Sequence, residues 1–161
     1  MTTFRCNIML EPAQLDFSYK THLLNKMKLH YEKQCTNQYG YIISVDDIET
    51  IHGNTIAPAD CSTVFDTTFK ITALKIEIGC VLLGTVCMVF PYGVFVEIFD
   101  KVNVLVQSKN LEEFKYNSED ILFEHDNITI KKGVKIEVIL CNVRYEKKKY
   151  VCIGRFKALV Y

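Results

Sequence analysis

The sequence from residue 79 to residue 157 contains only strand-like segments separated by turns. Apolar and β-branched side chains alternate with polar ones, which is typical of half-buried strands. The five segments that show this pattern are residues 80–90, 94–99, 102–107, 134–145 and 150–158. The turns between them contain Pro91 and Gly93, Asp100, and the run 146–148. So many strands in so short a span predict a sheet that closes upon itself.

The spacing of these strands predicts their order. Three strands follow one another through short turns, and then a polar stretch at 108–129, with room for a short helix, precedes the last two. Three meandering strands, a connector and two more strands are the order of the OB fold, a five-stranded, partly open barrel. Residues 79–161 are therefore expected to form an OB barrel.

The first half of the chain has a different pattern. Residues 4–8 alternate as in a strand, and residues 39–45 and 64–76 are rich in β-formers. Between them, apolar residues recur every four positions from Leu15 to Tyr31, which predicts a helix of about five turns. The turn residues in 51–60 predict a loop. Residues 1–78 are thus expected to form an α+β domain, an antiparallel sheet with one long helix.

Charge and cysteine content narrow the functional classes. The formal net charge is zero, but nine Lys or Arg residues and two Glu residues lie within 131–157, after an acidic connector. Such a basic segment is either a polyanion site or an ordinary solvated face. The seven cysteines are scattered without a C-x-x-C pair, which argues against zinc and favours a reducing, intracellular compartment. No signal peptide or membrane span is evident, and we expect neither a metal nor another cofactor.

Motifs of catalysis are missing from the sequence. The P-loop, the G-x-S-x-G elbow and the H-E-x-x-H helix do not occur, and the four histidines share no spacing. The paired acids at 112–113 and 119–120 lie on the polar connector, where a solvated loop is the simpler interpretation. We therefore expect a protein that is not an enzyme.

The barrel offers a better candidate site. Tyr92 and Phe95 bracket Gly93 at the first hairpin, where aromatic side chains of OB folds stack on bases. Cations for a nucleic-acid backbone are available at Lys101, Arg144, Lys148 and Lys149. The alternative is that Phe95 belongs to the core and that the lysines only solubilise the hairpins.

The motifs also resemble a known family. The run from Gly84 to Glu97, GTVCMVFPYGVFVE, resembles the S1-type OB signature G-x-V-x-x-x-x-x-x-G-x-F-V. The segments 39–45 (YGYIISV) and 51–60 (IHGNTIAPAD), with the strand around Phe65 and Phe69, are similar to the N-terminal half of the RNA polymerase stalk subunit. This family comprises the seventh subunit of RNA polymerase II and its archaeal, polymerase I and polymerase III relatives.

The resemblance implies a different function for each half of the chain. The N-terminal tip domain would dock on the polymerase core, near the largest and sixth subunits, through a tip loop containing Gly53, Asn54, Ile56, Pro58 and Asp60. A fourth-subunit-like protein is the usual stalk partner of this family. The barrel would contact nascent single-stranded RNA or initiation factors, with Gln107 at the position where many S1-type domains carry His. The compartment would be the nucleus for a cellular eukaryotic source, or the cytoplasm or virion for a viral one.

Two points remain open at the level of sequence. The family usually has Asp-Gly after the tip loop, whereas this chain has Asp60-Cys61, so the turn is expected to differ because Cys adopts positive φ only at a cost. The barrel alone would also suit a free-standing RNA-binding protein, such as a translation or RNA-decay factor. That alternative does not explain why an N-terminal α+β domain is present.

Overall fold

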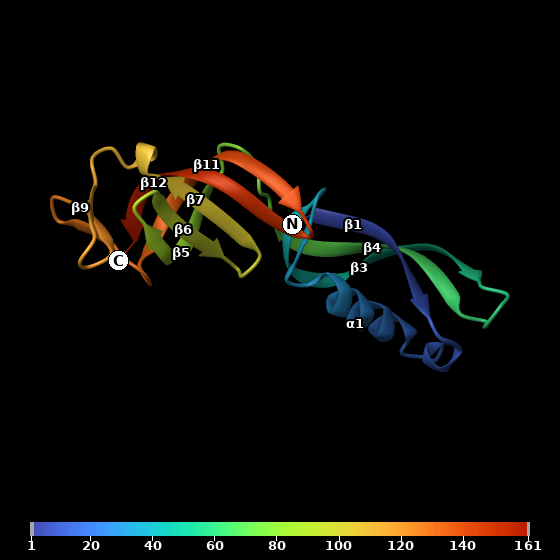
Figure 1. Cartoon of the computed structure of the whole chain (residues 1–161). Helices are drawn as coiled ribbons and strands as arrows, with labels where there is room; N and C mark the ends of the chain where they lie inside the picture. The colour runs from blue at the N-terminus through green and yellow to red at the C-terminus, as the bar shows by residue number, and fades with distance from the viewer. Residues whose placement is uncertain (1, 161) are drawn as a thin grey trace. The chain divides into compact units, whose positions relative to one another are not determined.

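The computed structural model describes residues 2–160 and divides the chain into two compact units, residues 1–74 and 75–161 (Figure 1). This division falls four residues before the expected boundary between residues 78 and 79. The terminal residues of the two expected domains, 1 and 161, lie outside the described part of the chain. Each unit has its own buried core, so each is described by itself.

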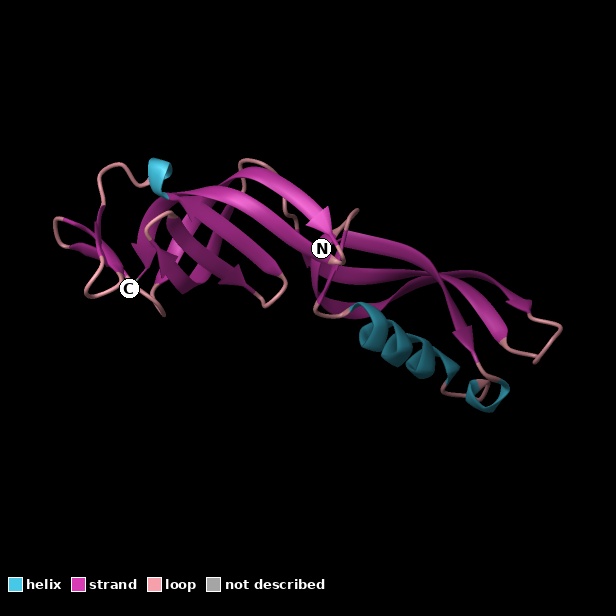
Figure 2. Ribbon diagram, in the orientation of Figure 1, coloured by secondary structure: helices cyan, strands magenta, loops and turns pink. Residues whose placement is uncertain are grey.

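The N-terminal unit is a four-stranded antiparallel sheet with one long helix on one face, as expected (Figure 2). Its strands follow the spatial order β1-β4-β3-β2. Leu23 and Met27 of the helix are fully buried and pack against Leu10, Ile42 and Phe69 of the sheet. In chain order the elements are β1 (Thr2–Leu10), the 3-10 helix η1 (Pro12–Gln14), α1 (Tyr19–Tyr31), β2 (Gln34–Thr36), β3 (Gly40–Ile56) and β4 (Thr63–Leu74).

The helix is shorter than its apolar stripe predicts. It begins at Tyr19, whereas Leu15 ends the preceding 3-10 turn by donating its amide to the carbonyl of Pro12 at 3.2 Å. Asp16 then accepts a hydrogen bond from the amide of Ser18 at 2.8 Å, a local turn that competes with helix formation. The short strand β2 was not predicted, because three residues show no measurable alternation.

The prediction of a loop at residues 51–60 is wrong for residues 51–56, which belong to a strand. Strand β3 continues to Ile56, and Gly53, Asn54 and Ile56 pair with Asp66, Phe65 and Thr63 of β4. Gly and Asn are poor strand formers, but a long partner strand with regular alternation outweighs local propensity. Four register shifts along β3 accommodate the pairing. Only residues 57–62 remain as the connection between the two strands.

The C-terminal unit is the predicted five-stranded barrel, and it is closed rather than partly open. The order β11-β12-β7-β6-β5 is completed by pairing of β5 with β11, and β12 runs parallel to β7. This is the strand order of an OB fold. The five strands are β5 (Val81–Phe90), β6 (Gly93–Ile98), β7 (Val102–Gln107), β11 (Lys135–Glu146) and β12 (Lys149–Val160).

The barrel interior is filled mainly by β-branched side chains and leaves no room at Gly84. A Cβ there would lie 2.8 Å from Cγ1 of Ile98 and 3.1 Å from the carbonyl oxygen of Glu97, and it would overlap Cγ1 of Val96. Gly154 is confined in the same way, with Cγ1 of Val104 at 2.8 Å. These two glycines allow neighbouring strands to approach closely in a small barrel.

The connector between β7 and β11 has more structure than its polar sequence predicts. It begins with the expected short helix, the 3-10 turn η2 (Ser108–Asn110). A small antiparallel sheet follows, in which Phe123 and Ile130 are buried. Its strands are β8 (Lys115–Asn117), β9 (Leu122–His125) and β10 (Ile128–Ile130).

Candidate nucleic-acid interface

An aromatic groove lies on the barrel where β5 turns into β6. Its volume is about 510 Å³. Phe90 and Phe95 meet edge to face, with ring centroids 5.8 Å apart, and Tyr92 is 83% exposed at the rim. The groove is lined by Phe90, Tyr92, Gly93, Phe95, Leu105, Gln107, Ser108 and Lys109. The arrangement offers ring faces for stacking together with one cation and one amide.

The backbone around Gly93 explains why these side chains converge. A Cβ at Gly93 would overlap the carbonyl oxygen of Val106 and lie 3.0 Å from Cα of Gln107. The amide of Ser108 also donates to the carbonyl of Tyr92 at 2.7 Å. The first hairpin is thereby held against the end of β7. Tyr92 and Gln107, 15 positions apart in the sequence, line one groove for this reason.

Gln107 has an unusual environment in the groove. Its Oε1 atom is buried and has no hydrogen-bond partner, although the side chain as a whole is only half-buried. An unsatisfied buried acceptor of this kind costs about 1–3 kcal/mol. Behind the groove, the thiol of Cys87 donates to the carbonyl of Phe95 at 3.3 Å, and burial raises the pKa of this thiol.

The predicted basic residues lie at the opposite end of the same strands. Gly93 pairs with Gln107 at one end of β6, whereas Ile98 pairs with Val102 at the other, about 16 Å away at 3.3 Å per residue. Lys101 follows the turn at the Ile98 end of β6, and its carbonyl accepts a hydrogen bond from the amide of Tyr150 at 3.1 Å. Lys148 and Lys149 lie directly before Tyr150 in the β11–β12 hairpin.

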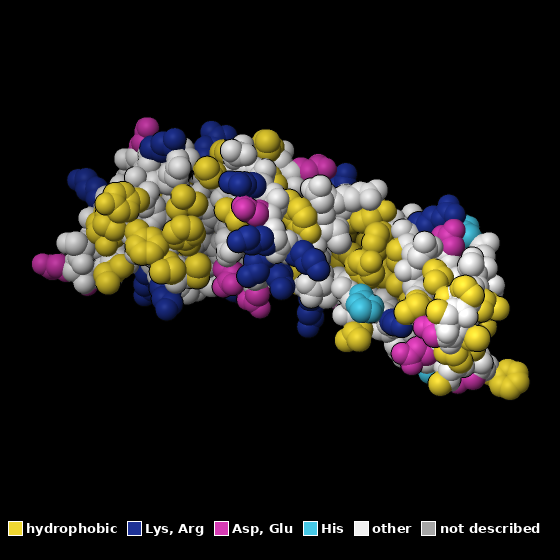
Figure 3. Space-filling view, turned by 45° about the vertical axis from the view of Figure 1, so that its right-hand side comes forward, with side chains coloured by type: hydrophobic (Ala, Val, Ile, Leu, Met, Phe, Trp, Pro, Cys, Tyr) yellow, Lys and Arg dark blue, Asp and Glu magenta, His cyan; other side chains and the backbone are white. Residues whose placement is uncertain are grey.

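The structure thus separates the predicted site into two groups. Tyr92, Phe95 and Gln107 share the groove, whereas Lys101, Lys148 and Lys149 gather beyond the other end of β6. Arg144 is near this basic group, but its Nε lies 3.3 Å from a carboxylate oxygen of Glu146, which reduces its availability for a phosphate. Figure 3 shows hydrophobic side chains and, beside them, Lys and Arg side chains on one face of the barrel.

Sequence reasoning missed four residues of the groove: Phe90, Leu105, Ser108 and Lys109. The signal for the first two was present in the alternation, because outward positions of paired strands share a face. Phe95 pairs with Leu105 across β6 and β7, and Phe90 pairs with Gly93 across β5 and β6. Ser108 and Lys109 could not be placed, since they lie beyond the third predicted strand, residues 102–107.

The second predicted site is the β3–β4 hairpin, whose loop is held by its own backbone. The amide of Ala57 donates to the carbonyl of Ser62 at 2.7 Å, and the amide of Cys61 donates to the carbonyl of Ala57 at 3.0 Å. Oδ1 of Asp60 accepts a hydrogen bond from the amide of Ser62 at 3.0 Å, and this hydrogen bond lowers the pKa of the Asp60 carboxyl. Ile56 and Pro58 remain exposed on the hairpin.

The turn at Cys61 has a strained backbone conformation. Cys61 adopts φ of 59°, which is the left-handed conformation that a Gly would occupy without cost. The hydrogen bonds that close the loop over residues 57–62 compensate the strain at this one exposed position.

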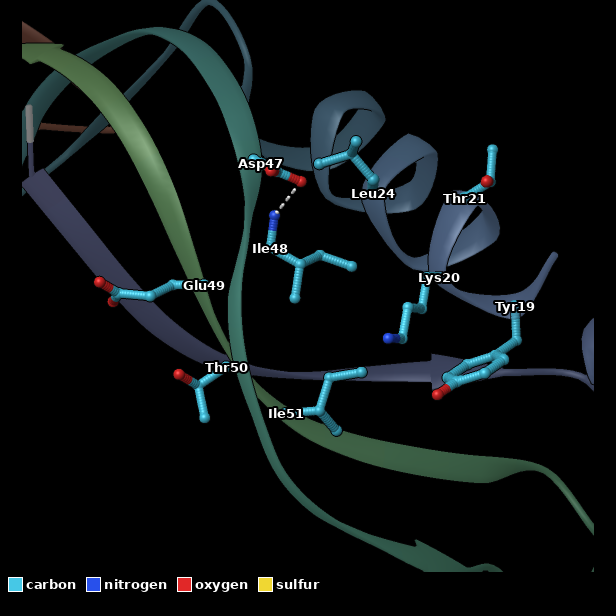
Figure 4. Close-up of a pocket in the computed structure, with 9 residues that line it drawn as sticks. All are labelled: Tyr19, Lys20, Thr21, Leu24, Asp47, Ile48, Glu49, Thr50 and Ile51. Atoms are coloured by element: carbon cyan, nitrogen blue, oxygen red, sulfur yellow. Dashed lines mark hydrogen bonds between the residues drawn. The ribbon is translucent and has the colours of Figure 1, made fainter.

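A hollow of about 570 Å³ lies between α1 and β3 (Figure 4). Lys20 and Leu24 border it from the helix, and Asp47 and Ile48 from the strand, where the amide of Ile48 donates to Oδ1 of Asp47 at 2.8 Å. No histidine or cysteine lines it.

Within residues 2–160, no group of three or more His, Cys, Asp or Glu side chains is placed to hold a metal ion. Over the same residues no helix is long and apolar enough to cross a bilayer.

These features define a class of protein: a two-domain binding protein with an OB barrel whose aromatic groove suits nucleic acid. Comparison with known families agrees. Residues 5–61 match the family described as "SHS2 domain found in N terminus of Rpb7p/Rpc25p/MJ0397", and residues 75–152 match the "S1 RNA binding domain". A curated relative, "DNA-directed RNA polymerase II subunit RPB7" of Saccharomyces cerevisiae, is 26% identical over 141 residues, which cover 84% of this chain and 82% of the relative.

The two domains occur in the order and combination expected for one family. The chain belongs to the RNA polymerase stalk subunit family and carries a C-terminal S1-type OB domain. This membership confirms the resemblance found in the sequence. It supports a role as a polymerase subunit that does not itself catalyse the reaction.

Proposed function

We propose that this protein is a non-catalytic stalk subunit that docks on a multisubunit RNA polymerase through its β3–β4 hairpin and contacts nascent RNA or initiation factors through its barrel. The observation that carries the proposal is an S1-type barrel with three aromatic side chains in one groove, joined to a domain of the family's N-terminal type. The largest and sixth-subunit homologues are the proposed core partners, with a fourth-subunit-like protein as a further partner in the stalk.

Docking is supported by the exposure of apolar side chains at one end of the N-terminal sheet. Leu10 pairs with Thr63, and Thr63 pairs with Ile56, so the hairpin and the segment after β1 lie at the same end. Ile56 is 64% exposed, and Phe17, in the segment after β1, is fully exposed. Exposed apolar groups gathered at one edge mark a protein interaction site.

RNA contact is supported by the chemistry of the groove. Base-aromatic stacking contributes about 1–3 kcal/mol per base and tolerates any sequence. Tyr92 presents its ring at the rim, and the exposed Lys109 lies beside it, where an ammonium group can neutralise one phosphate. So few cations predict modest affinity that falls with salt.

The docking proposal is tested by co-purification of the tagged full chain with polymerase subunits from its own source. Ile56→Ser should reduce recovery of the largest and sixth subunits. Ile43→Ser is a matched control, because Ile43 is also exposed on β3 but lies at the register shift between Ile42 and Ser44, far along the strand from the hairpin. Equal recovery for both variants would contradict docking through the hairpin. Recovery of translation or RNA-decay proteins, without polymerase, would favour the free-standing RNA-binding alternative.

RNA contact is tested by fluorescence anisotropy with a labelled single-stranded RNA. Tyr92→Ala should weaken binding about fivefold or more, as expected for the loss of one stacked base. Phe17→Ala removes a fully exposed aromatic ring from the other unit and should leave the affinity unchanged. If neither substitution changes the affinity for RNA, the groove is not the RNA-binding site.

For localisation we propose a reducing intracellular compartment, on the basis of the cysteine content.

A further inference from the structure

Gln107 combines two properties that no other residue of the groove has. It is the only amide among the lining residues, and its Oε1 atom is buried without a hydrogen-bond partner. The surrounding lining is aromatic or aliphatic apart from Gly93, Ser108 and Lys109. An acceptor in such a place lowers the stability of the empty groove, and a ligand that supplies a donor recovers that loss.

The acceptor can reach a ligand through a small movement. The side chain of Gln107 is half-buried, so part of it already borders the groove. The torsion that orients a terminal amide is broad, with low barriers, and its rotation carries Oε1 toward the open side. A planar ring inserted beside Tyr92 would then present its edge to this amide.

We propose that the groove holds one unpaired adenine base of single-stranded RNA, with the ring stacked on Tyr92 and the exocyclic amino group donating to Oε1 of Gln107. This inference rests on the proposed RNA contact and adds a base preference to it. The amide of Gln107 is then a specificity-determining group, while the aromatic rings supply stacking that any base can use.

Adenine is favoured over the other bases by its edge and its size. Its amino group is next to a ring nitrogen acceptor, so one amide can both accept from the base and donate to it. Uracil has no amino group, and guanine has a carbonyl oxygen at the ring position that carries the amino group of adenine. Cytosine has a similar donor-acceptor pair, but its single ring covers less of a groove built from Phe90, Tyr92 and Phe95.

The test is a chemical double-mutant cycle with the full chain. The probe is a labelled eight-nucleotide RNA of uridines with one central adenosine, compared with the same RNA carrying purine riboside, which lacks only the amino group. The unchanged protein should bind the adenosine RNA about three- to tenfold more tightly, as expected for one hydrogen bond. Gln107→Leu, of similar volume, should bind both RNAs equally.

A second variant separates hydrogen bonding from packing. Gln107→Glu keeps an acceptor for the amino group, so it should retain the preference for adenosine even if overall affinity falls through repulsion from phosphates. The inference is overturned if the unchanged protein binds both RNAs equally, or if Gln107→Leu, shown to be folded by circular dichroism, still discriminates. RNA binding without discrimination would leave the proposed RNA contact standing. Failure to bind either RNA would overturn both.

Discussion

Replacing Gly84 by Ala should destabilise the barrel without affecting the N-terminal unit. The added methyl group would overlap Cγ1 of Val96 and lie 2.8 Å from Cγ1 of Ile98. Both neighbours are β-branched side chains of a strand whose inner face is fully packed, so neither can rotate away freely. The carbonyl oxygen of Glu97 at 3.1 Å limits any shift of the backbone.

The expected magnitude follows from two opposing effects. Overpacking of this kind costs about 1–3 kcal/mol. Gly→Ala recovers about 0.4–1 kcal/mol, because it restricts the unfolded chain. The net loss for Gly84→Ala is therefore about 1–2 kcal/mol. Gly53→Ala is the matched control: no atom lies within 4 Å of its added Cβ, and its φ is negative, so it should be neutral or stabilising by about 0.4–1 kcal/mol.

Hydrogen exchange followed by mass spectrometry suits the measurement, because the chain contains no Trp and has two units. In Gly84→Ala, amides of β5, β6 and β11 should exchange about five- to thirtyfold faster, which is the population change for 1–2 kcal/mol. Amides of β1 and β4 should not change. A second change, Val96→Ala, removes the overlapping methyl, so the double variant should be more stable than the sum of the two single losses predicts. Strict additivity, or no effect of Gly84→Ala, would refute the packing argument.

Three further predictions concern other parts of the chain. Cys61→Gly should stabilise the β3–β4 hairpin by up to about 1 kcal/mol, since φ of 59° strains Cys but not Gly, and slower exchange of amides 57–62 would show it. The Arg5 guanidinium, hydrogen-bonded to both carboxylate oxygens of Asp66 at 2.9 and 2.7 Å, lowers the pKa of that carboxyl, so the pair stabilises the fold above about pH 4 and is lost as pH falls further. In Asp66→Asn, the melting temperature should fall less steeply as the pH drops below about 4. A fall as steep as that of the unchanged protein would contradict this. Burial, with a smaller effect of Asp66, raises the pKa of Cys6 to about 11, so iodoacetamide at pH 8 should alkylate the exposed Cys61 and Cys141 well before Cys6, as peptide mapping can test.

The sequence predicts the elements where periodicity and turn chemistry agree. All five barrel strands were located because their alternation runs for six residues or more and ends at clear turns. Residues 51–56 were misassigned because Gly53 and Asn54 are turn formers by local preference, and only the pairing with β4 makes them strand. The short strands β8, β9 and β10 lie in a polar stretch, where three or four residues give too little pattern.

The candidate site was predictable in kind but not in extent. Tyr92 and Phe95 are close in the sequence, so their meeting at the first hairpin required only the correct turn. The position of Gln107 beside them depends on the register between β6 and β7, which an aligned hairpin of six residues fixes. Charge alone does not indicate the end of a strand at which a residue lies, so the sequence does not separate the lysines from the aromatic residues.

The parallel pairing of β12 with β7 determines when the barrel can be completed during synthesis. Strands β5, β6 and β7 emerge from the ribosome first, and roughly forty residues separate the end of β7 from the start of β12. Until that span has been made, the inner faces of three strands stay uncovered and two sheet edges remain open to other chains. A premature stop within the connector would therefore release the N-terminal unit attached to an incomplete, aggregation-prone sheet.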